Sequence, residues 1–412
     1  MKTLLLFTLC LCFSAICLSQ TTAIPDPNFE QALIDLGHDS GTIDGTVLSA
    51  NINSVTELEI WSLNITDLTG IEGFTALEKL WCFNNNISSL EMSNLTALKD
   101  LNCSSNNITN LDVSNNTLLE HLICKANDLT SMNVSNNTGL KTLTCNNNMI
   151  TTIDVSNNTL LETLSFNLNP VTSIDVTNNP NLINLIFSFT SISSIDLSNN
   201  PVLEHLICPE NQLVNLEVNT NTALINLSCD NNNLSSLNLD NNANLEDLKC
   251  RNNTIVSLDL SNNTQLTNLY CDYNQLTSIN MKNGNNTILS IVRTENNPNL
   301  LCIEVEDAAY STANWTNIDS QTSFSEDCSA LSTNEFNLNS SISVYPNPVT
   351  TELNIAIKDN QSITSMELFN MLGKKIATTK ALNLDVSPYQ SGIYILKVST
   401  KEGQISKRII IE

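Results

Sequence analysis

The sequence has few of the large or conformationally free residues that most globular proteins use. Aromatic residues make up 5% of the 412 residues, and glycine occurs only 10 times. Leucine and asparagine are abundant instead. A chain so poor in aromatic side chains can still bury a core, but that core has to be aliphatic and regular.

Basic side chains are scarce over most of the chain. Residues 20–335 hold 36 acidic and 8 basic side chains, a net charge of −28, whereas residues 336–412 hold 6 acidic and 8 basic ones, a net charge of +2. A body this acidic repels nucleic acids and anionic membranes, so neither is expected as a partner. The charge suits cations or a basic partner, but plain solubility is the simpler interpretation.

Long apolar runs are also missing beyond the N-terminus. Residues 4–18 form one such run after Lys2, but it is shorter than the roughly 20 residues of a membrane-spanning helix. We interpret residues 1–19 as a secretory signal peptide that is cut before Gln20. The alternative is a lipid-anchored cysteine, although the residue before Cys17 suits it poorly. No membrane span is expected in the mature chain.

Signatures of catalysis are absent as well. The chain contains only three histidines, and neither HExxH, GxSxG nor a phosphate-binding glycine loop occurs. His121 and His205 lie four repeats apart, about 20 Å by strand spacing, so they cannot act as a pair. The sequence therefore predicts no enzyme activity, no catalytic residue, no cofactor and no metal site.

What the chain does have is a cysteine at a fixed interval. Eight cysteines form two groups whose members are 21 residues apart: Cys82, Cys103, Cys124 and Cys145, then Cys208, Cys229, Cys250 and Cys271. Phe166 and Phe187 occupy the two positions between the groups, and Ile60 and Arg293 extend the series by 22-residue steps. This period predicts a solenoid of about twelve turns over residues 55–305.

Each turn divides into two similar halves. Leu101-x-Cys103 and Leu111-x-Val113 alternate as strands do, with every second side chain turned inward. An asparagine five residues after each leucine is expected to bond backbone groups at a bend. Two strand-plus-corner halves close one coil, and neighbouring coils bury each other's apolar faces. Thr190 replaces one corner asparagine, so we expect turns 6 and 7 to be irregular.

This pattern resembles leucine-rich-repeat proteins, specifically the bacterial subclass whose 21-residue units contain two nested halves. The resemblance covers about 250 residues. It implies a curved or flattened solenoid that binds other macromolecules, and it does not identify the partner. The predicted fold is mainly β: a solenoid of parallel strands with a short N-terminal helical cap, followed by a small C-terminal antiparallel β-sandwich.

Both ends of the solenoid need covers for their apolar faces. Residues 20–54 are predicted to form the N-terminal cap, with a helix that Asp26 caps and Pro27 begins. One face of this helix is apolar: Phe29, Leu33 and Leu36.

Residues 306–328 are expected to form the C-terminal cap because they depart from the repeat. In an exported protein, we expect Cys302 and Cys328 to form a disulfide across this cap.

The last part of the chain has a different pattern. Residues 329–342 are rich in Ser and Asn, which is typical of a linker, and short alternating strands follow over residues 343–412. This segment resembles the type A sorting domain of the type IX secretion system of Bacteroidota-like bacteria. The residues that carry the resemblance are Tyr345, Pro346, Asn347, Pro348, Gly373, Gly392, Tyr394 and Lys397.

The resemblance implies the type IX machinery as a partner. It also implies passage across the outer membrane, removal of this domain, and commonly attachment of the mature protein to a surface glycolipid. The expected location is therefore the outer surface of a Gram-negative bacterium.

Two repeated features invite a metal hypothesis. Stacked thiols could bind a soft metal, but phenylalanine fills the same position in two turns, which favours buried free thiols. A row of carboxylates in the second half of the turns could bind calcium, although a solvated acidic face is the simpler interpretation. That row consists of Asp112, Asp154, Asp175, Asp196 and Asp259.

The outward side chains of the first strand vary most from turn to turn, and they include apolar residues. These fall into three groups: Trp81 and Phe83; Ile186, Phe189 and Ile207, with Leu168 nearby; and Tyr270 and Tyr273. Exposed aromatic residues are enriched in binding sites, but packing between turns would explain them equally well. The favoured function is a surface scaffold for protein binding or adhesion, with a protein or a surface glycan as ligand. A structural surface-layer component is the alternative, and a metal-binding or enzymatic protein is a third.

Overall fold

The computed structural model describes residues 20–329, 342–357, 363–400 and 404–412. The predicted signal peptide and most of the predicted linker lie outside the described residues. The chain divides into two compact units, one that extends to Glu326 and one over Asp327–Glu412. Each unit has its own hydrophobic core, so each is described by itself.

A small helical cap covers the first turn of the solenoid, as predicted. It consists of β1 (Thr21–Ala23), α1 (Pro27–Asp35), β2 (Thr46–Leu48) and α2 (Ser49–Ile52), and β1 pairs antiparallel with β2. The Asp26 side chain accepts hydrogen bonds from the backbone N–H groups of Asn28 at 2.9 Å and Phe29 at 3.0 Å. Its other oxygen accepts a bond from the Thr66 backbone N–H at 2.7 Å, which ties the cap to the first turn.

One residue of the predicted apolar helix face is misplaced. Phe29 and Leu33 are fully buried, and the Phe29 ring stacks on Phe74 with centroids 6.4 Å apart. Leu36 is exposed instead, because α1 ends at Asp35 and Leu36 is its C-terminal cap residue.

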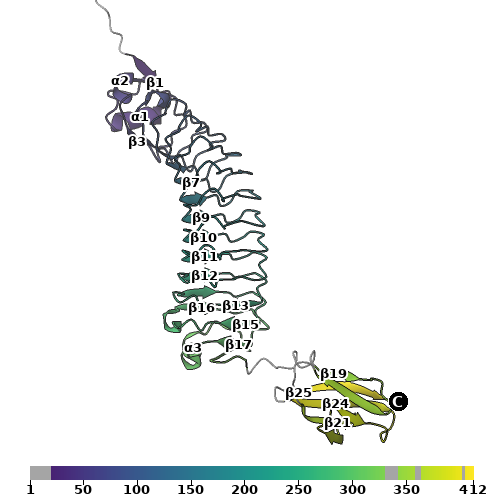
Figure 1. Cartoon of the computed structure of the whole chain (residues 1–412). Helices are drawn as coiled ribbons and strands as arrows, with labels where there is room; N and C mark the ends of the chain where they lie inside the picture. Colours follow the sequence, from purple (N-terminus) through teal and green to yellow (C-terminus); the bar gives the residue numbers. More distant parts are fainter. Residues whose placement is uncertain (1–19, 330–341, 358–362, 401–403) are drawn as a thin grey trace, which may run out of the picture. The chain divides into compact units, whose positions relative to one another are not determined.

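The solenoid is built on a twelve-stranded parallel sheet, and about twelve turns were predicted. Each strand has three residues, and neighbours pair in register, as Leu122 does with Leu143. Figure 1 shows the coils stacked one on the next, with a bend in the first half of the stack and a straighter second half. The strands are β3 (Glu57–Glu59), β4 (Lys79–Trp81), β5 (Asp100–Asn102), β6 (His121–Ile123), β7 (Thr142–Thr144), β8 (Thr163–Ser165), β9 (Asn184–Ile186), β10 (His205–Ile207), β11 (Asn226–Ser228), β12 (Asp247–Lys249), β14 (Asn268–Tyr270) and β16 (Ile291–Arg293).

The residue after each strand fills the predicted buried position. All eight repeated cysteines are fully buried, as are Phe166 and Phe187, whose rings stack with centroids 5.7 Å apart. Ile60 takes this position in the first turn, because Glu59 pairs with Trp81.

The prediction for Arg293 was wrong by one residue. Arg293 pairs with Tyr270 and points outward, so the fully buried Thr294 takes the position that follows Cys271. The last step is therefore 23 residues long. The two extra residues are accommodated between Met281 and Leu289, in a loop that contains the short helix η2 (Asn286–Ile288). A second short helix of the same length, η1 (Ile71–Gly73), lies in the first turn.

The second half of the turn forms strands only near the end of the solenoid. There β13 (Ser257–Asp259), β15 (Ser278–Asn280), β17 (Cys302–Glu304) and β18 (Ser323–Ser325) make a parallel four-stranded sheet. In earlier turns Leu111 and Val113 are buried as predicted, but this half does not form a strand. The physical reason is the sparse bonding between these halves: Asp128 N–H to Ile108 C=O at 3.0 Å is a single contact, not a ladder.

Corner asparagines hold each coil to its neighbour. The Asn127 side-chain amide donates to the backbone oxygens of Cys103 and Cys124, both at 3.1 Å, and its oxygen accepts from Ile108 N–H at 3.0 Å. A second column occupies the other corner: Asn116, Asn137, Asn158, Asn179, Asn200, Asn221, Asn242 and Asn263 are all fully buried. At Thr190 the sheet register is unbroken, and its hydroxyl bonds the side chain of Asn211.

The C-terminal cap closes the solenoid with α3 (Ala308–Asn314) and strand β18. The buried Trp315 packs edge-on against Tyr310 and Phe324, with ring centroids 6.3 and 5.6 Å apart. Cys302 and Cys328 form the predicted disulfide, which confirms that expectation.

The C-terminal unit is a sandwich of antiparallel sheets, as predicted. One sheet contains β19 (Ile342–Tyr345), β20 (Glu352–Ile357) and β23 (Asn383–Asp385). The other contains β22 (Lys375–Thr379), β21 (Ile363–Asn370), β24 (Gly392–Thr400) and β25 (Gln404–Ile411). Their inner faces bury an aliphatic core that includes Leu353, Leu368, Leu396 and Ile409.

The repeated thiols should not react with alkylating reagents until the solenoid unfolds. Burial raises the pKa of Cys103 and of Cys145 to about 12, so both are protonated near neutral pH, and the thiolate is the reactive form. In a chain that starts at Gln20, we expect iodoacetamide at pH 8 to leave the folded protein unmodified. Mass spectrometry should then find eight modified cysteines after unfolding without reductant. Fast labelling of the folded protein, or modification of Cys302 without reductant, would contradict this.

Candidate functional site

The outward side chains of the twelve-stranded sheet, together with the corner residues that follow each strand, form what we call the first-strand face. In β7 the buried Leu143 lies between the outward Thr142 and Thr144. The residue that ends each strand makes the central row of this face: Glu59, Trp81, Asn102, Ile123, Thr144, Ser165, Ile186, Ile207, Ser228, Lys249, Tyr270 and Arg293. Four of the predicted binding residues therefore share one row.

The other three predicted binding residues lie beyond the strand ends. Phe83 is two residues past Trp81. Phe189 and Tyr273 occupy the corner position three residues past the end of the strand, directly before the position of the corner asparagine. The corner position has a left-handed backbone in every turn, with φ of +53° at Phe189 and +57° at Tyr273. Leu168 occupies the same position with φ of +55°.

An aromatic cluster occupies the N-terminal end of the face. Trp61 stacks on Phe83 with centroids 5.4 Å apart and nearly parallel planes, and Trp81 lies 6.5 Å from Phe83. The ammonium group of Lys79 lies 3.8 Å from the Trp81 ring centroid, a cation–π contact. Trp61 was not predicted, although the 22-residue step from Ile60 to Cys82 places it beside Phe83.

An apolar patch lies in the middle of the face. Ile186 and Ile207 are partners in neighbouring strands. Phe189 and Leu168 stand at corners nearby, with 55% and 51% of their surfaces exposed. The structure thus brings the second predicted group together on adjacent turns.

A cationic cluster surrounds Tyr270 near the other end. The cationic groups of Lys249, Arg251 and Arg293 lie 5.7, 5.4 and 5.8 Å from its ring centroid. These are three of the eight basic residues in residues 20–335, so they interrupt an otherwise acidic surface. Sequence reasoning missed this cluster, because Lys249 and Arg251 share one turn while Tyr270 and Arg293 come from the next two turns.

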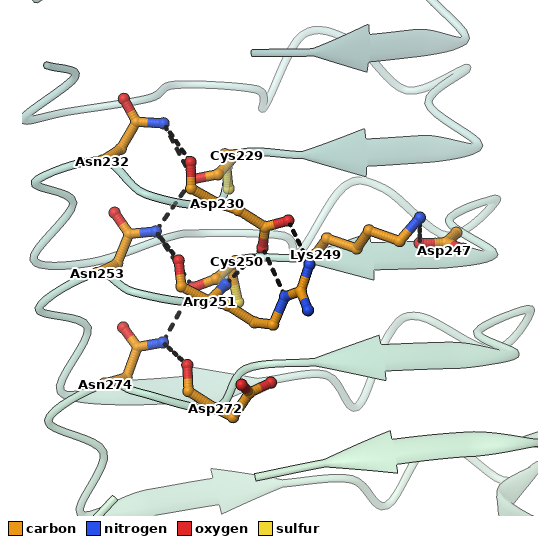
Figure 2. Close-up of polar contacts among 10 residues, drawn as sticks. All are labelled: Cys229, Asp230, Asn232, Asp247, Lys249, Cys250, Arg251, Asn253, Asp272 and Asn274. Atoms are coloured by element: carbon orange, nitrogen blue, oxygen red, sulfur yellow. Dashed lines mark hydrogen bonds and ion pairs between the residues drawn. The ribbon is translucent and has the colours of Figure 1, made fainter. Parts of the chain in front are cut away.

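Two of these cations already have carboxylate partners, as Figure 2 shows. Arg251 donates to Asp230 at 3.2 and 3.4 Å, and Lys249 lies 3.4 Å from Asp247. The hydrogen bond to Asp230 raises the pKa of Arg251 further above its ordinary value. Arg293 forms no ion pair with any described residue.

The acidic row on the opposite half of the turns has a structural use. The Asp112 carboxylate accepts a bond from the Ser114 backbone N–H at 2.9 Å, and Asp154 does the same with Ser156. Hydrogen bonding by the Ser114 side chain and backbone lowers the pKa of Asp112 below its ordinary value. Within the described ranges, no three His, Cys, Asp or Glu side chains are grouped closely enough to hold a metal ion.

Residues of the predicted sorting motif hold the C-terminal unit together. The Asn347 side chain donates to Arg408 C=O and accepts from Ile410 N–H, both at 2.8 Å, which fastens this segment to β25. Gly373 closes a turn after β21, where its φ of +77° suits glycine. In β24 the Tyr394 hydroxyl donates to Gln390 C=O at 2.9 Å.

Comparison with known proteins identifies the C-terminal unit. Residues 343–412 match the family described as the secretion system C-terminal sorting domain, and this unit is a type IX sorting domain. In the part of the chain that the structure describes, no helix is long and apolar enough to cross a membrane.

Solved structures show that the solenoid has the leucine-rich-repeat fold of bacterial internalins. The functional domain of InlJ from Listeria monocytogenes, which is described as including a cysteine ladder, is 26% identical with a TM-score of 0.66; the match covers 96% of this chain and 99% of that one. An internalin, InlF, from the same species is 21% identical with a TM-score of 0.57, over 74% of this chain and 96% of that one.

A plant peptide hormone receptor, RGFR1, in complex with RGF2, shares the fold at 18% identity and a TM-score of 0.54, over 61% of this chain and 45% of that one. No curated protein matches the sequence. The chain therefore combines a leucine-rich-repeat solenoid with a secretion domain.

The sorting domain should be necessary for export but not for the fold of the solenoid. Because the solenoid has a separate core, deletion of residues 336–412 should leave it folded. Cell fractionation should then find the truncated protein in the periplasm, while a full-length Thr144→Ala control reaches the surface. Display of the truncated protein at the level of the control would contradict the assignment.

Proposed function

We propose that this protein is a surface-displayed, non-catalytic scaffold for protein binding or adhesion, and that the first-strand face is its binding surface. The type IX domain supports export to the outer surface of a Gram-negative bacterium, after loss of the signal peptide and of the sorting domain. The partner would be a protein or a surface glycan. RGFR1, whose structure shares this fold, is described in complex with RGF2, which illustrates that such a solenoid can present a binding face.

The observation that carries the proposal is the presence of large apolar side chains at left-handed corners. An L-residue in this conformation is less stable by about 1–2 kcal/mol, and only glycine, asparagine or aspartate adopts it readily. Most turns place a small or polar residue there: Asn84, Ser105, Ala126, Asn147, Glu210, Asn231, Asn252 and Asn296. Leu168, Phe189 and Tyr273 are the exceptions, and each is more than half exposed.

These three side chains gain little from the fold in return. An exposed apolar side chain loses the hydrophobic stabilisation that burial would give, about 1.5–3 kcal/mol for a residue of this size. Packing between turns therefore accounts poorly for them. A ligand that covers them would recover that free energy, as hot-spot aromatics do in protein interfaces.

A purely structural surface layer would need neither variation nor exposed apolar groups. The central row instead changes from Trp81 through Ser165 to Tyr270, while the residues beneath it stay uniformly leucine. This contrast favours recognition over a structural role.

The substitution Phe189→Asn separates folding from binding. Asparagine tolerates the left-handed corner, so we expect the free energy of unfolding to stay equal or to rise by up to about 1 kcal/mol. Loss of a hot-spot aromatic should weaken partner binding by about 2 kcal/mol. Urea titration and capture of cell-surface proteins and glycans on immobilised protein would measure the two effects.

Trp81→Ala should likewise reduce capture, and Thr144→Ala in the same central row is the matched control. Capture that survives both the Phe189 and the Trp81 changes, but is lost when Asp154, Asp175 and Asp196 become Asn, would place the binding surface on the acidic row instead.

A further inference from the structure

The cluster around Tyr270 contains polar groups that the fold leaves without partners. Arg293, at the end of β16, is exposed and makes no ion pair or side-chain hydrogen bond with any described residue. The Tyr270 hydroxyl makes no hydrogen bond with the described residues either. Asp272 is nine-tenths buried, and its Oδ1 has no hydrogen-bond partner among the described residues.

A buried carboxylate oxygen without a donor is unfavourable. Leaving such a group unsatisfied lowers stability, and does so more when the group is charged. Burial raises the pKa of Asp272 above its ordinary value, although Arg251 and Arg293 act in the opposite direction. Arg251 is not the donor in the structure, because its side-chain hydrogen bonds go to Asp230.

The placement of these groups follows from the register of three turns. Lys249, Tyr270 and Arg293 are consecutive in the central row, because β12 pairs with β14 and β14 with β16. Strands are spaced about 4.8 Å apart, so the two outer cations are separated by about 10 Å at the backbone. Asp272 follows Tyr270 by two residues, and Figure 2 shows it in the turn next to Arg251.

We propose that this cluster, which we call the Tyr270 site, binds a carboxylated sugar residue, a hexuronic acid, of a glycan. The sugar carboxylate would accept hydrogen bonds from Arg293 and from the Tyr270 hydroxyl, with Lys249 contributing charge. A neighbouring sugar hydroxyl would donate to the Asp272 carboxylate. The inference rests on the proposed function, because it assigns a ligand class to part of the first-strand face.

The required ligand carries an anion and a hydrogen-bond donor side by side. A hexuronic acid has both on one ring, since its hydroxyl groups lie next to its carboxylate. The carboxylate of a Glu or Asp side chain has no donor beside it. A peptide anchored through that carboxylate would hold its backbone N–H groups away from the buried Asp272.

Isothermal titration of the full chain tests the proposal with defined probes. The probes are trigalacturonic acid, a glucuronic-acid-substituted xylotriose, the neutral xylotriose and hexaglutamate, at low ionic strength. We expect at least one uronic acid probe to bind about tenfold or more tightly than xylotriose and hexaglutamate, since a hydrogen bond to a charged group contributes about 1.5–3 kcal/mol.

Three variants locate the site. Arg293→Gln should weaken uronic acid binding about tenfold, and Tyr270→Phe, which removes only the hydroxyl, about threefold or more. Tyr310→Phe, which removes a hydroxyl of the C-terminal cap, is the control for the hydroxyl, and Lys99→Gln, which removes a cation of another turn, is the control for charge. Both controls should bind as the unchanged protein does.

Several results would overturn the proposal: no binding of either uronic acid probe, equal binding of hexaglutamate, or unchanged affinity in Arg293→Gln. The failure of the proposed function is distinguishable from these results. If the Tyr270 site fails but Phe189→Asn still abolishes capture of surface material, only the ligand assignment is wrong. If uronic acid binds while the Phe189 and Trp81 changes leave capture intact, the assignment of the wider first-strand face as the binding surface is wrong.

Discussion

The structure depends on one repeated interaction, the side-chain amide of a buried corner asparagine bonded to the backbone of two successive turns. Asn148 shows the arrangement: its amide donates to Cys124 C=O at 3.1 Å and to Cys145 C=O at 2.9 Å, and its oxygen accepts from Leu129 N–H at 3.0 Å. Buried backbone groups at a bend have no strand partner, so without such a side chain they would be unsatisfied. The 21-residue period follows, because the next asparagine has to arrive at the same corner.

This constraint divides the residues of each turn into two classes. Leucine, cysteine and asparagine positions face inward and repeat, since every coil has to match the one beside it. Outward side chains of the first strand do not have to match the neighbouring coil, so they can differ between turns. Three groups lie at such outward positions: the aromatic cluster at Trp81, the apolar patch at Phe189 and the cations around Tyr270.

The sequence predicted the fold well because the period is set by local bonding. The twelve turns, the buried cysteine positions, the disulfide and the C-terminal sandwich were all expected from it. The errors lie where the period slips or where a half turn has few bonds. Arg293 was misplaced because a loop before β16 absorbs two extra residues, and the second half-strands were absent from most turns because single hydrogen bonds join them.

The candidate site was only partly predictable. Trp81, Phe83 and Phe189 were identifiable as apolar residues at outward positions. The cations around Tyr270 were not, because Tyr270 and Arg293 join Lys249 and Arg251 only through the stacking of three turns. The unsatisfied oxygen of Asp272 could not be predicted either, since burial at that corner depends on the side chains of adjacent coils.

Urea unfolding of two variants of the same turn is the most direct test of the account. It shows whether the corner asparagine stabilises the fold while an outward residue of that turn contributes little to stability. Asn148→Ala removes the bonds of a buried amide and leaves backbone groups unsatisfied, so the free energy of unfolding should fall by about 2 kcal/mol or more. Thr144→Ala changes an outward residue of that turn and should stay within about 0.5 kcal/mol of the unchanged protein. Equal losses in the two variants would contradict the account.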